Sequence, residues 1–444
     1  MPASPRVPTA LLAALLALAW CAAAVTVPAQ EQTHVLRAGT LIPVAGDPID
    51  DAVLVFRQGR IVALGPADAV DVPADAVVLD HSEAVVMPGL VDTHSHLSTP
   101  WAADGSHPLQ PEVRALDGLD VRDATFAKAR AGGITTVNIM PGSGHLMSGQ
   151  TVYLKLRDGR VLEDLAIRVD DGSEGGRMAG GLKMANGTNS QDEPPFPGTR
   201  AKSAAMVREM FVKAQEYGAK RAGDDPPDRD LALDTLLEVL DGTRVVHHHT
   251  HRADDIMTVL RLRDEFGFRV VLQHVSEGYK VADQIAAAGV PCSVIVIDSP
   301  GGKIEAIDMD WGNAGALERA GAVVGFHTDD PVNDSRLFLR SAAFGVRAGM
   351  GRDAALAGMT LAGARMLDLD DRIGTLEVGK DADFVVLSGD PLSVYTRVRQ
   401  TWVEGAKVFD LADPDDALMA EGGYGAGQPR PGGMLCCFGK EDWR

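Results

Sequence analysis

Four of the 12 histidines of this 444-residue chain stand almost side by side in the stretch VVHHHTHRADDI. They are His247, His248, His249 and His251. Two valines precede them and Arg-Ala-Asp-Asp-Ile follows, a pattern that predicts a strand running into a loop and a helix. Because alternate side chains of a strand share one face, His247, His249 and His251 would point one way and His248 the other. Barrel enzymes carry their chemistry at such strand ends.

A second pair of histidines stands in VMPGLVDTHSHL. His94 and His96 are two positions apart, so on a strand both side chains project from the same face, as two ligands of one metal ion must. Neutral imidazole is the commonest metal ligand in proteins. The spacing alone is equally compatible with a hydrogen-bonded histidine pair that binds no metal.

The segments that would position these histidines change character along the chain. Residues 33–88 contain short alternating segments separated by turn residues, and similar segments return in IGTLEVGKDADFVVLSGDP and VRQTWVEGAKVFD. Between them, strand-like runs such as GITTVNIM and RVVLQH alternate with helical segments. Repeated strand–helix units over roughly 250 residues are the size of a (β/α)8 barrel, and the two ends of the chain would build a side sheet. A doubly wound sheet is the competing architecture, but no Gly-rich dinucleotide fingerprint follows an early strand.

The composition restricts the class of partner. The formal net charge is −20 and 45% of the residues are hydrophobic. Such a chain can bury a large core, in one barrel or in two domains. A nucleic-acid partner is disfavoured, because a phosphate backbone needs a basic face and the sequence contains no Lys/Arg run. We expect a small-molecule substrate and a homo-oligomer.

The N-terminus has the pattern of a targeting segment. Arg6 precedes the apolar run TALLAALLALAWCAAAVTV, and small residues lead to a cleavage point after Ala29. We therefore expect export, to the periplasm or as a secreted protein, and no membrane span, because the apolar run is too short for one. A lipoprotein anchored at Cys21 is disfavoured, because bulky Trp20 stands where a small residue is needed.

The remaining cysteines do not predict a disulfide framework. Cys292 falls on a predicted strand, and Cys436 and Cys437 are adjacent in the segment GGYGAGQPRPGGMLCCFGKEDWR. Adjacent cysteines bridge each other only with strain, and a lone buried thiol behaves as a small hydrophobe, so we assign none of them a catalytic role. The Gly/Pro-rich segment would form either an ordered arm at a subunit interface or a flexible tail.

Six motifs follow one another within the region from about Leu36 to about Asp410: PGLVDTHSHL, GGLKMANG, HHHTHRADD, VVLQH, HTDDP and GTLEVGKDADFVVL. Their order resembles the amidohydrolase superfamily, and most closely its imidazolonepropionase-like branch, which includes metal-dependent dipeptidases. The resemblance implies an α/β fold: a distorted, TIM-like (β/α)8 barrel with one or two divalent metal ions at the C-terminal ends of its strands. A composite β-sandwich built from both termini would flank this barrel.

The expected domain boundaries combine this resemblance with the targeting pattern at the N-terminus and the composition of the C-terminal segment. They are a signal peptide at 1–29, the N-terminal portion of the β-sandwich at 30–88, the metal-dependent barrel at 89–368, the C-terminal portion of the β-sandwich at 369–412 and a Gly/Pro-rich tail at 413–444.

The resemblance also assigns six side chains to the metal centre. They are His94 and His96 on the first barrel strand, Lys183 as a carboxylated lysine, His249 on the fifth strand, His274 on the sixth and Asp329 on the eighth. An ammonium group cannot bind a cation, whereas a carbamate offers two anionic oxygens. Alternatively, Lys183 is an unmodified lysine on the barrel rim that forms an ion pair or contacts substrate. Zinc, as one or two ions, is the expected metal.

Two of these residues are also expected to be catalytic. Asp329 would accept a proton from the attacking hydroxide and hand it to the leaving nitrogen, while Asp330 orients a loop. His274 would be a ligand or, if it is not one, would polarise the carbonyl group under attack.

Other polar residues near the motifs are expected to contact substrate or to pack. We expect substrate contacts from His251, Arg252 and His145. His247 and His248 are expected to pack in the core, each with one satisfied ring nitrogen.

Together these residues predict an exported, metal-dependent hydrolase that cleaves a C–N bond of a small substrate by metal-activated hydroxide. A dipeptide or an N-acyl amino acid is the leading substrate class. A cyclic-amide hydrolase or a heterocycle deaminase is the enzymatic alternative, and a single metal ion would favour a deaminase. A non-catalytic binding protein on the same fold is a third hypothesis, which the presence of all expected ligands disfavours.

Overall fold

The computed structural model of the protein describes residues 32–98, 104–170, 172–173, 175–296, 303–423 and 425–426. The expected signal peptide and the cysteines Cys21, Cys436 and Cys437 lie outside these residues. Export, lipid anchoring and the role of the C-terminal segment therefore stay predictions. Cys292 is described, and its thiol is free and buried, which raises its pKa.

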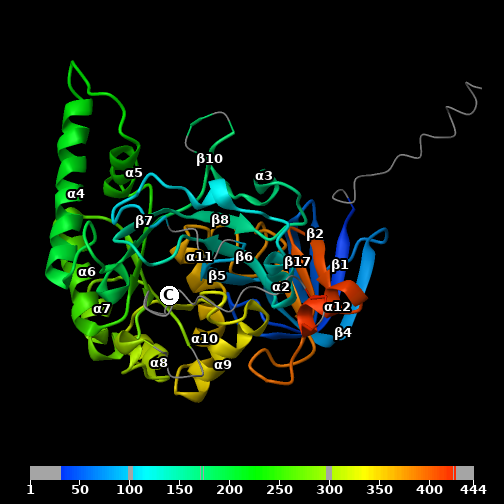
Figure 1. Ribbon diagram of the computed structural model, residues 1–444. Coiled ribbons are helices and arrows are strands. Elements are labelled where there is room, and N and C mark those ends of the chain that lie inside the picture. The colour runs from blue at the N-terminus through cyan, green and yellow to red at the C-terminus, as the bar shows by residue number, and fades with distance from the viewer. Residues whose placement is uncertain are drawn as a thin grey trace, which may run out of the picture.

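Strands from both ends of the described chain share one sheet. Its order is β18 (Ala406–Asp410), β17 (Val398–Val403), β16 (Phe384–Leu387), β4 (Val77–Pro88), β1 (His34–Leu41), β2 (Ile49–Arg57) and β3 (Arg60–Pro66). β4 pairs parallel with β1 and antiparallel with β16, so it joins the N-terminal strands to the C-terminal strands (Figure 1). Phe56, Phe384 and Trp402 pack on one another, with 5.4 Å between the ring centroids of Phe384 and Trp402. A division of this sheet into two sandwich layers stays a prediction.

The inner strands form two further sheets. One contains β15 (Val324–Phe326), β14 (Cys292–Val294), β13 (Val270–His274), β12 (Val246–Thr250), β11 (Leu182–Ala185) and β7 (Met147–Gln150), and the other contains β5 (Leu90–Ser95), β6 (Ile134–Ile139) and β8 (Val152–Lys155). β11 to β15 pair parallel with one another, as do β5 and β6, whereas β7 and β8 are antiparallel to their neighbours. Nearly all of their residues are buried, as is typical of parallel strands covered on both faces.

Backbone hydrogen bonds connect these two inner sheets. Thr151, which lies between β7 and β8, donates its N–H to the carbonyl oxygen of Gly181 at 2.9 Å. Beyond the other end of the six-stranded sheet, Asp329 donates its N–H to the carbonyl oxygen of His94 at 2.9 Å. No β-ladder pairs β15 with β5 among the described residues, so the ladders alone leave the predicted closed (β/α)8 barrel unconfirmed. The second bond nevertheless brings the end of β5 against the segment that follows β15.

Helices connect the inner strands and lie around their outside (Figure 1). The described α-helices are α2 (Ala124–Ala131), α3 (Leu162–Leu165), α4 (Arg200–Arg221), α5 (Leu231–Leu240), α6 (Ala253–Phe266), α7 (Ala282–Ala287), α8 (Asn313–Arg319), α9 (Leu339–Arg347), α10 (Arg352–Gly358), α11 (Leu361–Met366) and α12 (Pro414–Glu421). α6 shows how they form: Ile256, Val259 and Leu260 make a buried stripe, and the helix ends at Gly267, whose φ of 77° favours glycine. Among the described helices, none has the length and apolar character needed to cross a membrane.

Shorter elements complete the described chain. β9 (Arg168–Val169) and β10 (Arg177–Met178) form a two-stranded sheet, and short 3-10 helices cover Ala115–Gly118, Gly187–Ser190, Gly278–Lys280, Ile304–Ala306 and Ser335–Leu337.

Lys155, the last residue of β8, ties the inner strands to the seven-stranded sheet. Its Nζ lies 2.6 Å from Asp381 Oδ2 and 2.6 Å from Asp383 Oδ2, just before β16. All three side chains are almost completely buried. Removing one partner of a buried ion pair is costly, because the remaining charge is left without compensation.

We expect Lys155→Met to lower the free energy of unfolding by about 3–5 kcal/mol, because Asp383 stays buried without its cation, whereas Asp381 keeps Arg60 and Arg372. The matched control is Lys407→Met, which removes a lysine from a partly exposed pair with Asp410 and should cost below about 1 kcal/mol. Urea unfolding followed by circular dichroism measures both variants. A small and equal loss in the two would contradict the anchoring role of Lys155.

Candidate metal centre

The ends of the inner strands bring the six predicted ligands into one buried cluster. They are His94, His96, Lys183, His249, His274 and Asp329, and each is at most 1% exposed. The carboxyl ends of parallel strands lie at one edge of a sheet, so side chains from β5, β11, β12, β13 and the segment after β15 meet there.

His94, His96 and Asp329 form the first of three groups that could hold a metal ion. Asp329 Oδ1 lies 3.0 Å from His96 Nε2 and 3.3 Å from His94 Nε2. His96 Nδ1 lies 2.8 Å from the carbonyl oxygen of Met140, which can only accept, so Nδ1 carries a proton. His96 Nε2 then has a lone pair that faces the Asp329 carboxylate oxygen. These two electron-rich atoms repel each other at this distance unless a proton or a cation lies between them. The geometry therefore fits a bound metal ion.

His249, His251 and His274 form the second group. Their rings lie close together, with 4.3 Å between the centroids of His249 and His274 and 4.6 Å between those of His249 and His251. His249 Nδ1, His251 Nε2 and His274 Nε2 have no hydrogen-bond partner in the described part of the chain. Buried polar atoms without a partner are costly, and a bound cation would satisfy them. The structure thus adds His251, which we expected to contact substrate, to the residues that could hold a metal.

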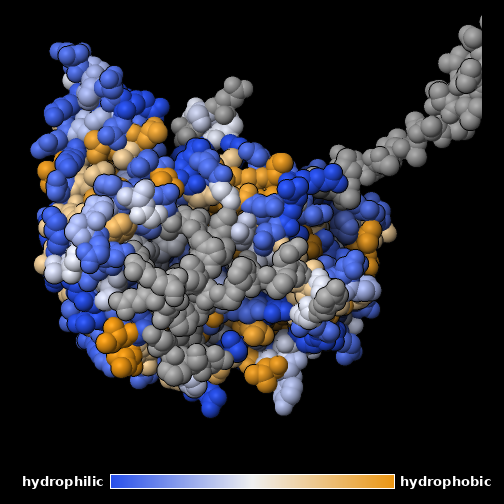
Figure 2. Space-filling model, viewed as in Figure 1, coloured by the Kyte–Doolittle hydropathy of each residue, from blue (hydrophilic) through white to orange (hydrophobic). Residues whose placement is uncertain are grey.

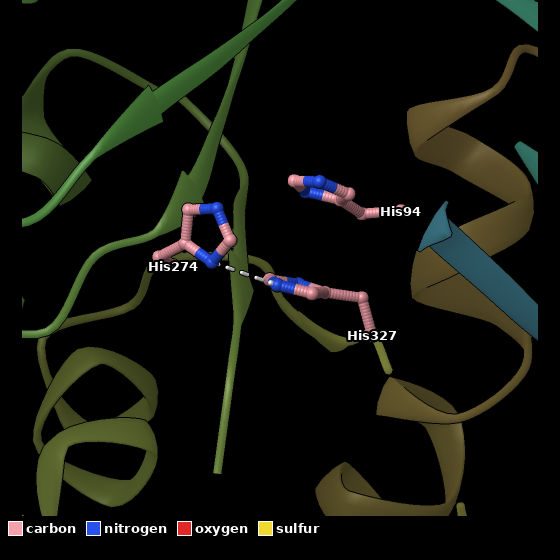
Figure 3. Close-up of side chains that lie close together, drawn as sticks. All are labelled: His94, His274 and His327. Atoms are coloured by element: carbon pink, nitrogen blue, oxygen red, sulfur yellow. Dashed lines mark hydrogen bonds between the residues drawn. The ribbon is translucent and has the colours of Figure 1, made fainter. Parts of the chain in front are cut away.

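His94, His274 and His327 form the third group (Figure 3). The rings of His94 and His327 stack with 4.9 Å between their centroids, and His327 Nε2 lies 3.1 Å from His274 Nδ1. Sequence analysis missed His327. It stands two positions before Asp329 in GFHTDDP. Alternate residues of an extended segment share one face, so this spacing could have indicated that His327 lies beside Asp329.

Two lysines contact different histidines of the cluster. Lys183 Nζ lies 3.1 Å from His94 Nε2. Lys303 Nζ lies 3.2 Å from His249 Nε2 and 3.6 Å from Glu305 Oε2, and its side chain is only 5% exposed. Lys303 was not predicted, because it belongs to a segment without a recognisable motif or strand pattern.

Burial keeps the imidazoles of the cluster neutral. It is the largest cause that lowers the pKa of four of them well below the usual value: His94, His249, His251 and His274. Burial alone would raise the pKa of Asp329, but the hydrogen bond with His96 and nearby positive charges outweigh it and lower that pKa to about 2. Neutral imidazole and ionised carboxylate are the forms that bind cations, and this N/O donor set suits zinc.

The segment that carries Asp329 is fixed by Asp92. Asp92 accepts hydrogen bonds from Thr328 N at 3.0 Å and from Thr328 Oγ1 at 2.6 Å. Asp329 itself has a φ of 51°, a left-handed conformation that costs a residue other than glycine about 1–2 kcal/mol. Asp330 Oδ2 accepts a hydrogen bond from Ser335 Oγ at 2.6 Å, a contact of the kind expected from a residue that orients a loop.

Arg252 and His145, which were expected to contact substrate, lie beside residues outside the histidine cluster. The Arg252 side chain is 45% exposed and pairs with Asp254 at 3.0 Å, because Arg252 immediately precedes α6 and follows the surface of that helix. His145 is buried, with its ring 5.4 Å from that of Phe196. The roles of Arg252 and His145 toward substrate stay predictions.

His247 and His248 pack within the core. His247 Nε2 lies 2.9 Å from Tyr153 OH, and His247 Nδ1 lies 3.1 Å from Gln273 Nε2. His248 Nδ1 donates to the carbonyl oxygen of His249 at 3.0 Å. Burial is the main cause that lowers the pKa of His247 to about 3 and that of His248 to about 4.

Comparison with known proteins gives this cluster a chemical class. The sequence pattern of the Amidohydrolase family matches residues 85–414, and the chain therefore belongs to that family. Its members are metal-dependent hydrolases with a fold of the TIM-barrel type, and the protein is accordingly an enzyme that acts on C–N bonds. The predicted family membership is confirmed.

Relatives of known name support this membership. The chain is 27% identical over 376 residues to the amidohydrolase tasK of Hapsidospora irregularis, covering 77% of this chain but only 38% of that protein. It is 23% identical over 410 residues to an imidazolonepropionase of Symbiobacterium thermophilum, covering 80% of this chain and 90% of the relative.

Solved structures agree. An amidohydrolase from Thermotoga maritima superimposes with a TM-score of 0.77 and 30% identity, covering 85% of this chain and 99% of the other. A Xaa-Pro dipeptidase with bound methionine in its active site superimposes with a TM-score of 0.55 and 16% identity, covering 85% of this chain and 99% of the other. The second likeness shows the fold alone.

We expect the metal-free protein to lose stability as the pH falls from about 7.5 to about 5.5. The pKa values of His247 and His327 are about 3 in the folded protein, far below the value of about 6.5 of an unfolded chain. The unfolded chain therefore binds more protons below that value, and each such histidine costs up to about 1.4 kcal/mol per pH unit there. Urea unfolding after chelation measures the slope.

His247→Gln serves as the comparison, because it removes one buried imidazole outside the cluster and should make the slope shallower by about one proton. Stability that stays level or rises on acidification would contradict the neutral state of these histidines.

Proposed function

We propose that the protein is a zinc-dependent hydrolase that cleaves the C–N bond of a small substrate, namely a dipeptide or an N-acyl amino acid rather than a protein chain. The observation that carries the proposal is the set of buried, unpartnered ring nitrogens on His249 and His274 beside ionised Asp329. Such a site stabilises a cation and leaves a carboxylate within reach of the reacting atoms.

The six predicted ligands would hold one or two zinc ions. Lys183 would join as a carbamate in the two-metal form, since buried lysines change charge state readily and only the neutral amine reacts with carbon dioxide. Zinc bound here would supply Lewis acidity, which polarises a carbonyl group and makes water more acidic.

Asp329 would move the proton in the reaction. Its carboxylate is ionised at neutral pH, so it can accept a proton from the attacking water and pass it to the leaving nitrogen. The hydrogen bonds from Thr328 to Asp92 hold this segment still, which keeps the carboxylate in line with the site. Burial excludes bulk water and strengthens every charge interaction there.

Lys303 favours substrates that carry a carboxylate. Its ammonium lies at the buried cluster, 3.2 Å from His249 Nε2, and its distance of 3.6 Å to Glu305 exceeds that of a charge-assisted hydrogen bond. Glu305 is shared with Arg200. Lys303 can therefore donate to the free carboxylate of a dipeptide or N-acyl amino acid whose amide lies over the cluster.

A cyclic-amide hydrolase or deaminase is the second candidate function. The imidazolonepropionase relative covers most of this chain, which favours a ring substrate of comparable size. Hydrolysis of a lactam panel but of no open-chain amide would select this candidate.

We further propose a closed (β/α)8 barrel flanked by a composite β-sandwich, export after cleavage of the N-terminal segment, and a homo-oligomeric assembly. The hydrogen bond between Asp329 and His94 and the shared seven-stranded sheet support the first proposal. The apolar N-terminal run supports the second.

Asp329→Asn should lower kcat by about 10²–10⁴-fold with the fold intact, because a carboxamide cannot accept the proton. Asp330→Asn is the matched control, and it should keep measurable turnover because Asp330 contacts Ser335. Steady-state hydrolysis of a panel of dipeptides and N-acyl amino acids compares the two. If Asp330→Asn lost activity while Asp329→Asn kept normal rates, the base would be Asp330, and our assignment of Asp329 would be wrong.

Lys303→Met should raise KM for an N-acetyl amino acid by at least about tenfold, because a charge-assisted hydrogen bond is worth about 1.5–3 kcal/mol. The corresponding amino-acid amide, which has no carboxylate, should lose little. Lys280→Met is the control, since Lys280 forms pairs with Glu277 and Asp308. An equal rise in KM for both substrates would show that Lys303 does not recognise the carboxylate.

A further inference from the structure

Glu305 is a buried carboxylate that joins separate segments of the chain beside the histidine cluster. It lies in the short 3-10 helix Ile304–Ala306, two residues after Lys303. Glu305 Oε1 accepts hydrogen bonds from Thr188 N at 2.5 Å and from Arg200 Nη2 at 2.5 Å. Glu305 Oε2 lies 3.6 Å from Lys303 Nζ. The carboxylate therefore connects the loop that follows β11 to the turn that carries Lys303.

Gly187 makes room for this carboxylate. A Cβ atom at residue 187 would lie 2.5 Å from Glu305 Oε1 and 2.7 Å from Glu305 Oε2, which is too close for a carbon–oxygen contact. Gly187 also has a φ of 74°, a conformation that favours glycine. The backbone conformation and the missing side chain at this position both fit the close approach of Glu305.

Arg200 connects Glu305 to a third element. Its Nε donates to Asp255 Oδ2 at 2.9 Å, and Asp255 lies in the first turn of α6. Arg200 begins α4, which packs against α6 (Figure 1). Asp255 and Glu305 are both buried, so each depends on the shared guanidinium group to offset its charge.

The turn that carries Lys303, residues 303–307, is attached to the rest of the chain largely through this carboxylate. Ile304 and Ile307 are each 76% exposed and so contribute little packing. The bond from Ala306 N to the carbonyl oxygen of Lys303, 3.0 Å long, is internal to the turn. Among the described residues, the hydrogen bonds that join residues 304–307 to earlier segments all end on the Glu305 carboxylate.

We propose that Glu305 is a positioning residue that holds Lys303 at the histidine cluster by anchoring its turn to the loop after β11. Lys303 Nζ lies 3.2 Å from His249 Nε2. Because Thr188 and Arg200 already donate to Glu305, the carboxylate can fix the turn without a short ion pair to Lys303. Recognition of a substrate carboxylate by Lys303 rests on the proposed function, but the anchoring of the turn does not.

Acetylation of the full-length protein with acetic anhydride, followed by mass spectrometry, tests the anchoring directly. The Lys303 side chain is 5% exposed, so it should react slowly in the wild type. In Glu305→Ala it should react at least about tenfold faster, because the turn loses hydrogen bonds to a charged group and opens more often. Lys407, whose side chain is 41% exposed, should react equally in both proteins. Equal protection of Lys303 in the two proteins would overturn the proposal.

Gly187→Ala tests the same contact without removing a charge. The added methyl group should displace the Glu305 carboxylate and make Lys303 as reactive as it is in Glu305→Ala. Gly267→Ala is the matched control, because Gly267 has a similar φ of 77° but a Cβ atom there would meet nothing within 4 Å. Wild-type protection of Lys303 in Gly187→Ala would overturn the proposal. If Glu305→Ala does not fold, this comparison decides.

Steady-state kinetics test the consequence for substrate. Glu305→Ala should raise KM for an N-acetyl amino acid by at least about tenfold, keep kcat within about threefold, and change little for the corresponding amino-acid amide. Adding Glu305→Ala to Lys303→Met should raise KM no further than Lys303→Met alone, because both changes remove the same contact. Glu265→Ala breaks an exposed pair with Arg208 and should behave like the wild type.

The outcomes separate the anchoring from the proposed function. KM effects that multiply in the double variant, or an equal rise in KM for the amide, would show that Glu305 does not act through Lys303 and would overturn the positioning role. A wild type that hydrolyses none of these substrates, combined with a reactive Lys303 in Glu305→Ala, would refute the proposed function and leave the anchoring by Glu305 standing.

Discussion

A carboxylate that stays ionised while fully buried is the constraint on which the rest of the site depends. Asp329 has no contact with bulk water, and an isolated buried charge is among the most expensive features a protein can carry. Its surroundings offset that cost by placing imidazoles and the Lys183 ammonium around it. His94, His249 and His274 are themselves buried and neutral, so they contribute ring nitrogens rather than positive charge. A divalent cation would add positive charge beside Asp329 and would satisfy the unpartnered ring nitrogens at the same time.

The fold surrounds Asp329 by bringing distant segments of the chain together at the carboxyl ends of the inner strands. His94 ends a strand near the start of the described chain, and Asp329 lies more than two hundred residues later, yet one backbone hydrogen bond of 2.9 Å joins them. Asp92 then fixes Thr328, so the strand that carries His94 also orders the segment that carries Asp329. Lys155 fastens the seven-stranded sheet to these inner strands from the side. The anchoring elements therefore hold the ligands in place rather than contribute chemistry.

Much of the site was predictable from spacing, and what was missed has physical reasons. The two-residue spacing of His94 and His96 and the alternation within the histidine run pointed to side chains that lie together in one buried cluster, because strand geometry is local. His327 was not predicted, because it lies just after the strand that ends at Phe326 and the acidic residues that follow it carry the stronger signal for a metal ligand. Lys303 approaches from a loop, whose path depends on tertiary packing that no sequence pattern encodes. Arg252 was expected to contact substrate. In the structure it precedes α6 and pairs with Asp254 at the surface, and its role toward substrate stays a prediction.

Anomalous diffraction at the zinc edge, from crystals of the protein prepared with zinc, tests the central claim most directly. We predict a zinc peak at about 2.0–2.2 Å from ring nitrogens of His94 and His96 and an oxygen of Asp329. A second peak beside His249 and His274, with additional density on Lys183 Nζ, would be the two-metal form. An active enzyme with no zinc peak in this cluster, or with its only peak elsewhere, would contradict the assignment of these residues as the metal centre.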